Sequence, residues 1–149
     1  MAVAFGCKRN DCCLPPETNS VVALKGNNEW RTTGYLFKQN TRKDTVIFSA
    51  SKEQEHLVIH LKKSGSGYVM IDAGLYNLTG DIVNADYVLD ASKSSSFNTL
   101  TSTDDLLEGE FTLYFKLNHG GTTYPSTVIF KNGIFRVRYD NIPPAPMHG

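Results

Sequence analysis

The stretch that decides the fold is EFTLYFKL, residues 110–117. Its large apolar residues stand at every second position, namely Phe111, Leu113, Phe115 and Leu117. Successive side chains of a β-strand point to opposite faces, so this alternation predicts a strand with one face in a core and the other in water. A half-buried strand of this kind is typical of an antiparallel sheet.

The same period of two continues along most of the chain. In residues 67–73, for example, it predicts that Val69, Ile71 and Ala73 share one face. No segment shows a helical period over ten residues. Serine- and glycine-rich loop signals separate the candidate strands, which lie at residues 32–38, 44–50, 55–62, 67–73, 87–90 and 97–101.

The dipeptide Asn132-Gly133 lies between two further alternating runs. Asn-Gly favours a two-residue type I′ turn, so the sequence predicts a β-hairpin here. In that register Phe130 lies opposite Phe135, and Val128 lies opposite Val137. The large apolar residues then meet on one face, which agrees with the hydrophobic pattern.

About eight strands with short loops predict an all-β fold, an antiparallel β-sandwich, with a small calycin-like β-barrel as the alternative. The chain has 149 residues, which is the length of one domain. We expect a β domain over residues 27–140, large enough to form a core without disulfides. Residues 141–149, NIPPAPMHG, contain three prolines and predict an extended tail.

The net charge of the chain indicates which kinds of partner to expect. Fifteen basic and fifteen acidic residues give a formal net charge of +0. Nucleic-acid binding through phosphates needs a surplus of positive charge, so we expect no nucleic-acid partner. No apolar run reaches about 18 residues, so we also expect no complete transmembrane helix.

All three cysteines lie near the start of the chain. Ala4-Phe5-Gly6-Cys7 resembles the lipobox of bacterial lipoproteins. That resemblance implies that residues 1–6 are the remnant of a signal peptide, that Cys7 is acylated, and that residues 7–26 form a lipoprotein head and flexible tether. The adjacent Cys12 and Cys13 pair only through a strained ring, so we expect thiols or intermolecular partners.

Three segments of the body resemble small uncharacterised β-rich lipoproteins of Bacteroidetes-type bacteria. The resemblance spans about half the chain and implies an all-β domain on a lipid anchor at the cell envelope. It brings no catalytic residues. The segments are GLYNLTG at residues 74–80, LEGEFTL at 107–113 and IFKNGIFRV at 129–137.

Two clusters contain residue types that can bind metal ions. His56 and His60 are four residues apart in a candidate strand, which separates them by about 13 Å, too far for one zinc ion. We therefore expect both on a solvated face. His119 is expected in a loop, and His148 lies in the tail. The carboxylates of Asp104, Asp105, Glu108 and Glu110 lack the spacing of a calcium loop and predict a solvated turn.

Aromatic residues are the remaining candidates for binding. Aromatic side chains combine apolar area with a polar group, so they are favoured at recognition sites, although they are also common in strands for packing reasons. A face of this kind would bind a sugar or a protein. Its candidate members are Trp30, Tyr35, Tyr68, Tyr76, Tyr87, Tyr114 and Tyr124.

The sequence lacks a nucleophile elbow, a phosphate-binding loop, a dinucleotide fingerprint and a His-Glu-x-x-His motif. We expect no enzymatic activity, cofactor or metal. The expected function is an envelope-anchored lipoprotein that acts as a binding or structural module. The alternative is a periplasmic or secreted β-barrel that binds a small lipid or carbohydrate. A small hydrolase with an unrecognised site is a third hypothesis.

Overall fold

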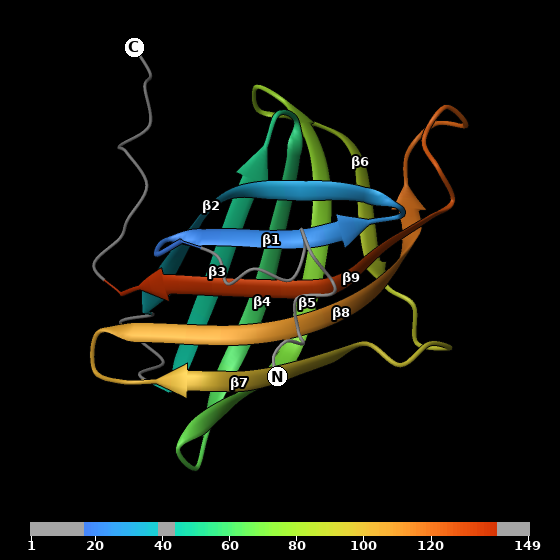
Figure 1. Cartoon of the computed structure of the whole chain (residues 1–149). Coiled ribbons are helices and arrows are strands. Elements are labelled where there is room, and N and C mark those ends of the chain that lie inside the picture. Colours follow the sequence, from blue (N-terminus) through green and yellow to red (C-terminus); the bar gives the residue numbers. More distant parts are fainter. Residues whose placement is uncertain (1–16, 39–43, 140–149) are drawn as a thin grey trace.

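The computed structural model describes residues 17–38 and 44–139, and these form nine β-strands and no helix (Figure 1). This confirms the all-β prediction. Each expected strand before residue 120 is present, most of them longer than expected, whereas the two runs expected to form a hairpin belong to one strand. The strands are β1 (Ser20–Lys25), β2 (Asn28–Lys38), β3 (Thr45–Lys52), β4 (Glu55–Ser64), β5 (Gly67–Thr79), β6 (Ile82–Leu89), β7 (Ser96–Ser102), β8 (Leu106–His119) and β9 (Thr127–Arg138).

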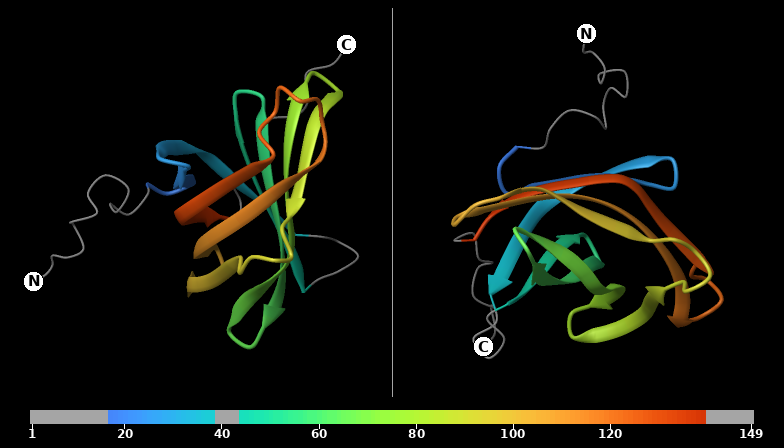
Figure 2. Two further views of the ribbon diagram at one scale, coloured as in Figure 1. Left: turned by 90° about the vertical axis from the view of Figure 1, so that its right-hand side faces the viewer. Right: turned by 90° about the horizontal axis from the view of Figure 1, so that it is seen from below.

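All nine strands belong to one antiparallel sheet in the order β6-β5-β4-β3-β2-β1-β9-β8-β7. A further pairing joins β6 to the second half of β8, so hydrogen bonds close the sheet on itself, and β7 flanks the first half of β8. Figure 2 shows the result as two facing layers, in which β1, β9 and β8 cross over β3 to β6. The interior between these layers holds the core.

Strand β1 corrects the expected domain boundary. The sequence predicts a flexible tether over residues 7–26, yet residues 20–25 form a strand between β2 and β9. Val21, Val22 and Ala23 have no exposed surface. Three consecutive apolar residues do not alternate with polar ones, so the period of two did not predict a strand here. The β domain therefore begins before Gly26.

The hairpin predicted at Asn132-Gly133 is wrong. Both residues lie inside β9, which has β1 on one side and β8 on the other. Asn132 has a φ of 53°, but Gly133 is not among the residues with positive φ, and a type I′ turn requires positive φ at both positions. The pairing of Phe130 with Phe135 is also wrong, because both residues belong to the same strand.

Instead of a turn, β9 contains a β-bulge. On β8, Phe111 lies opposite Gly133 and Leu113 lies opposite Phe130, so β9 has one residue more than β8 between these pairs. The extra residue shifts the alternation by one. Apolar residues on both sides of the bulge therefore face the core, which explains why the same residues also suited a hairpin. They are Val128, Phe130, Phe135 and Val137.

A second irregularity corrects the face predicted for Val69 and Ile71. These side chains are 48% and 53% exposed, whereas Ala73 is buried. The β4–β5 pairing shifts between His60 and Leu61, and residue 71 has no partner in the register. The prediction assumed unbroken alternation, and the shift reverses the faces on either side of it.

The core consists of packed apolar side chains contributed by both layers. Phe48 of β3 stacks on Phe135 of β9, with ring centroids 4.2 Å apart. Phe115 of β8 meets Phe130 edge to face. All four rings are at most 1% exposed. Among residues 17–38 and 44–139, no helix is long and apolar enough to cross a membrane.

Candidate functional site

An ion pair lies at the end of the sheet where β1 turns into β2. Lys25 ends β1, Trp30 lies in β2 and Glu55 begins β4. The Glu55 carboxylate accepts hydrogen bonds from both partners, with Oε2 bonded to the Lys25 ammonium and Oε1 to the Trp30 indole N–H, at 3.0 Å in the latter case. Trp30 is 3% exposed, so Glu55 satisfies the polar group of a buried indole.

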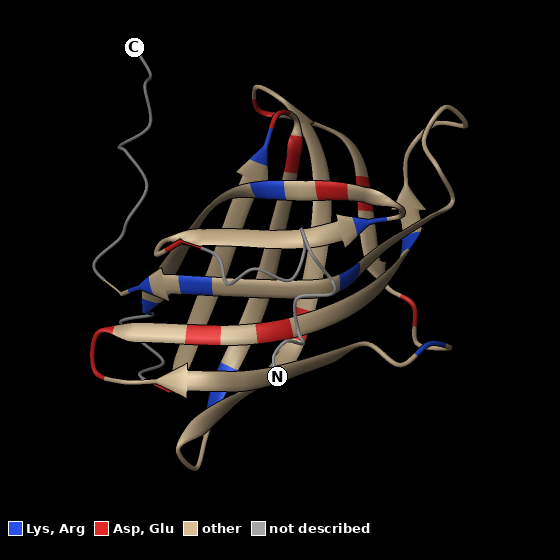
Figure 3. Cartoon of the chain, viewed as in Figure 1, with Lys and Arg blue, Asp and Glu red and all other residues tan. Residues whose placement is uncertain are grey.

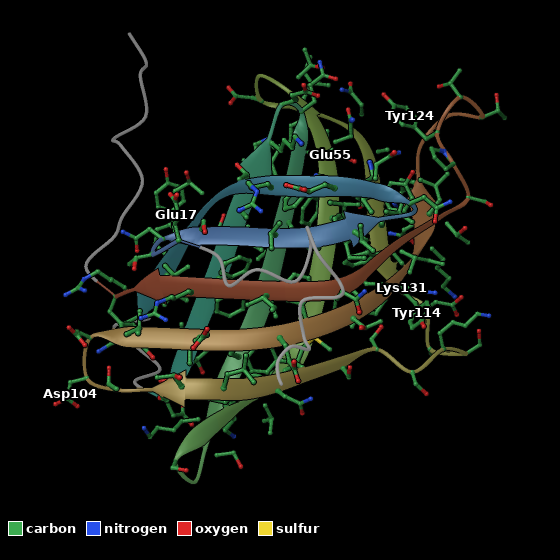
Figure 4. All side chains as sticks on the ribbon, in the orientation of Figure 1. Glu17, Glu55, Asp104, Tyr114, Tyr124 and Lys131 are labelled. Atoms are coloured by element: carbon green, nitrogen blue, oxygen red, sulfur yellow. The ribbon has the colours of Figure 1, made fainter. Side chains whose placement is uncertain are left out.

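Beside this ion pair lies a pocket of about 190 Å³, which we name the tyrosine pocket. Figure 4 labels Glu55 and Tyr124, which lie toward the same end of the molecule. The pocket draws on β1, β4, β5, β6, β9 and the loop between β8 and β9. Its lining residues are Lys25, Glu55, Leu75, Tyr76, Asn77, Tyr87, Tyr124, Pro125 and Val128.

Tyr87 connects the sheet to the loop that contributes Tyr124. Its hydroxyl donates a hydrogen bond to the carbonyl of Pro125 at 2.8 Å. Burial raises the pKa of Tyr87, and the nearby Glu55 carboxylate and Tyr124 raise it further. The Tyr87 hydroxyl therefore keeps its proton and remains a donor at neutral pH. The loop is also held by a bond from the Tyr124 amide to the Gly121 carbonyl.

The lining suits a small amphipathic ligand. Leu75 and Val128 form apolar walls, and Tyr76 is 37% exposed at the surface. Lys25, Glu55 and Asn77 add donors and acceptors. Among the residues that line this pocket there is no serine, cysteine or histidine. The lining therefore combines apolar surface with hydrogen-bond donors and acceptors.

The structure brings together four of the seven aromatic candidates. Tyr76, Tyr87 and Tyr124 line the pocket, and Trp30 contacts it through Glu55. Tyr68 lies elsewhere and accepts a hydrogen bond from the Tyr139 hydroxyl at 3.2 Å. Tyr35 and Tyr114 are not among the lining residues.

Lys25 and Glu55 were not recognised as site residues from the sequence. The sequence predicts that Lys25 lies in the tether, and Glu55 is one charged residue at the start of a candidate strand. They meet because β1 ends and β4 begins at the same edge of the structure, although 30 residues separate them. Local sequence carries no signal for such a pair.

The histidines lie as expected on the outer side of β4. His56 and His60 are half-buried and alternate with the fully buried Leu57, Ile59 and Leu61. The Nδ1 atom of His56 is 2.6 Å from the Ser51 hydroxyl on β3. His119, expected in a loop, is the last residue of β8. In the described part of the chain, no three His, Cys, Asp or Glu residues are grouped to hold a metal ion.

The four clustered carboxylates separate in the structure. Asp105 pairs with Arg138 at 3.0 Å, and Glu108 accepts a hydrogen bond from Thr101. Asp104 is exposed in the turn before β8, and Glu110 lies further along the strand. The expected turn is confirmed at Asp104 and Asp105, whereas Glu108 and Glu110 lie within β8.

Several predicted features fall on residues that the structure does not describe. These are the signal remnant at residues 1–6, the acylated Cys7, Cys12 and Cys13, the tail at 141–149 and His148. Comparison of the chain with models of protein families and with curated proteins finds no match.

Proposed function

We propose that this protein is a non-enzymatic binding module that holds one sugar ring in the tyrosine pocket. The observation that carries the proposal is the convergence of Tyr76, Tyr87 and Tyr124 on the ion pair of Lys25 and Glu55. A sugar ring has apolar C–H faces and a polar rim of hydroxyls. Tyrosine rings match the faces, and the charged pair and Asn77 match the hydroxyls.

Size supports a single ring over a lipid. A volume of about 190 Å³ lies below the range of about 300–1,000 Å³ that is usual for drug-sized ligands. An acyl chain would need a continuous apolar space. Phe48, Phe115, Phe130 and Phe135 occupy the interior instead.

The experiment is a titration with methyl glycosides of glucose, galactose and N-acetylglucosamine. Trp30 is the single tryptophan of the chain, and it bonds Glu55 beside the pocket, so its fluorescence reports directly on binding. We expect a saturable change with one of these glycosides. Tyr124→Ala weakens that binding, whereas the matched control Tyr114→Ala, outside the pocket, leaves it unchanged.

Absence of any saturable change, or equal weakening by both variants, contradicts sugar binding in this pocket. A saturable response to a fatty acid but not to glycosides favours the lipid-binding alternative. Conversion of a bound glycoside to a new product contradicts the non-enzymatic role.

We also propose that the module is anchored at the bacterial cell envelope through an acylated Cys7. The support is the resemblance of residues 4–7 to a lipobox and the polar segment that follows. The test is the intact mass after expression in a Gram-negative host with the native upstream region. We expect loss of residues 1–6 and added acyl mass, both absent in Cys7→Ala. An unmodified mass contradicts the anchor.

A further inference from the structure

A second hollow lies away from the tyrosine pocket, on the outer face of β7, β8 and β9. It has a volume of about 220 Å³. We name it the polar hollow, because five of its lining side chains carry oxygen or amide groups. The lining residues are Ser96, Asn98, Glu110, Phe111, Thr112, Asn132, Gly133 and Ile134.

The β-bulge in β9 creates one wall of this hollow. Asn132 occupies the bulge with a φ of 53°, a left-handed conformation that asparagine adopts more readily than other residues that carry a side chain. Bulges often redirect a side chain and are common next to functional sites. Here the bulge brings Asn132 to a hollow whose other lining residues include Ser96 and Asn98 of β7 and Glu110 and Thr112 of β8.

The polar groups of the hollow are unused. Within residues 17–38 and 44–139, the side chains of Ser96, Asn98, Glu110, Thr112 and Asn132 make no hydrogen bond or ion pair. Neighbouring carboxylates differ, because Glu108 bonds Thr101 and Asp105 pairs with Arg138. The hollow therefore presents five hydrogen-bonding side chains to solvent.

The charge of the hollow selects the ligand. Figure 3 shows acidic segments on β8 beside basic segments of β9. In the register Arg136 lies opposite Glu108, whereas Glu110 lies opposite the apolar Ile134. Glu110 is thus the single charged residue of the lining and has no counterion among the described residues. One carboxylate with neutral oxygens disfavours anions and supplies few of the carboxylates that calcium prefers.

We propose that the polar hollow binds a small polyhydroxylated amine, with its primary ammonium on Glu110 and its hydroxyls on Asn98 and Asn132. An ammonium group has three donors and needs several acceptors. The Glu110 carboxylate and the Ser96 and Thr112 hydroxyls supply them. The two asparagine amides offer both donors and acceptors to hydroxyl groups.

The test uses glucosamine as the probe and glucose as the matched ligand without the ammonium. We expect glucosamine to shift the side-chain amide NMR signals of Asn98 and Asn132 in a saturable way, and glucose to act more weakly. Glu110→Gln should weaken glucosamine binding about fivefold, the effect of one exposed charge pair. Glu108→Gln, two residues away on the same face of β8, should leave it unchanged.

A second variant separates binding from folding. Asn132→Gly suits the positive φ and keeps the bulge, but removes the amide, so it should weaken binding while the folded spectrum persists. The proposal is overturned if glucosamine shifts none of these signals, if glucose binds equally well, or if Glu110→Gln binds as tightly as the natural protein. Trp30 fluorescence monitors the tyrosine pocket separately, so failure at one site is distinguishable from failure at the other.

Discussion

The indole N–H of Trp30 donates to Glu55 Oε1 at 3.0 Å, across a sequence separation of 25 residues. The same carboxylate bonds the Lys25 ammonium through its other oxygen. One acidic side chain therefore satisfies a buried indole of β2 and holds a cation of β1 at the tyrosine pocket.

Loss of this carboxylate should destabilise the fold. We expect Glu55→Ala to lower the free energy of unfolding by about 1–3 kcal/mol, because the buried Trp30 N–H loses its acceptor. Glu55→Gln keeps a side-chain oxygen for Trp30 and should cost less. Urea unfolding followed by tryptophan fluorescence measures both variants. Equal losses in the two variants would show that the hydrogen bond to the Trp30 indole is not the main way in which Glu55 stabilises the fold.

The Tyr87 hydroxyl should hold the loop that carries Tyr124. In Tyr87→Phe the Pro125 carbonyl loses its donor, and we expect a loss of about 0.5–1.5 kcal/mol in stability. Amide hydrogen exchange of Tyr124 and of Leu117, which donates to Ser126, should become faster. Unchanged exchange at these two amides would argue that other contacts hold the loop.

Alkaline pH should destabilise the protein through two tyrosines. Burial raises the pKa of Tyr139, and its hydrogen bond to Tyr68 raises it further. Burial also raises the pKa of Tyr87, and the nearby Glu55 carboxylate adds to this effect. A phenol with a raised pKa keeps its proton to a higher pH in the folded state than in the unfolded state. The contribution of each tyrosine to the free energy of unfolding is therefore constant below the ordinary pKa of about 10. This contribution is lost as the pH rises above that value.

The measurement for this prediction is urea unfolding between pH 8 and pH 11. Stability should fall above pH 10, and it should fall less steeply in Tyr139→Phe. Tyr35→Phe serves as the control, because Tyr35 in β2 shares no hydrogen bond with Tyr139 or Tyr87. An identical pH dependence in the natural protein and Tyr139→Phe would show that Tyr139 does not contribute.

The bulge of β9 predicts opposite responses at two adjacent residues. A Cβ atom at Gly133 would lie 2.4 Å from ring atoms of Phe111, so Gly133→Ala should cost about 1–3 kcal/mol through overpacking. Asn132→Gly relieves a left-handed residue and should leave stability unchanged or raise it by up to about 1 kcal/mol. Thermal unfolding compares the two. A stable Gly133→Ala variant would indicate that the Phe111 ring moves aside readily.

Part of this structure was predictable from local sequence. Alternation at Phe111, Leu113 and Phe115 correctly predicted which side chains of β8 enter the core, because the side chains of any strand alternate in this way. The same rule was wrong at Val69 and Ile71, where the pairing of β4 with β5 shifts by one residue. Sequence alternation identifies strands but does not locate their irregularities.

The hairpin predicted at Asn132-Gly133 shows the same limit. The dipeptide did mark a backbone irregularity, since Asn132 has positive φ. Whether the chain reverses there depends on its neighbours. Strands β1 and β8 pair with β9 along both of its sides, so the backbone continues straight and absorbs the extra residue as a bulge.

The sequence by itself determined the all-β class, because the period of two is a property of each strand alone. Only the tertiary structure decided the sheet order, its closure through β6 and β8, and the meeting of Lys25, Glu55 and Tyr124. These features depend on contacts between segments that are far apart in the chain. Side chains that meet only after strands pair leave no periodic signal in the order of residues.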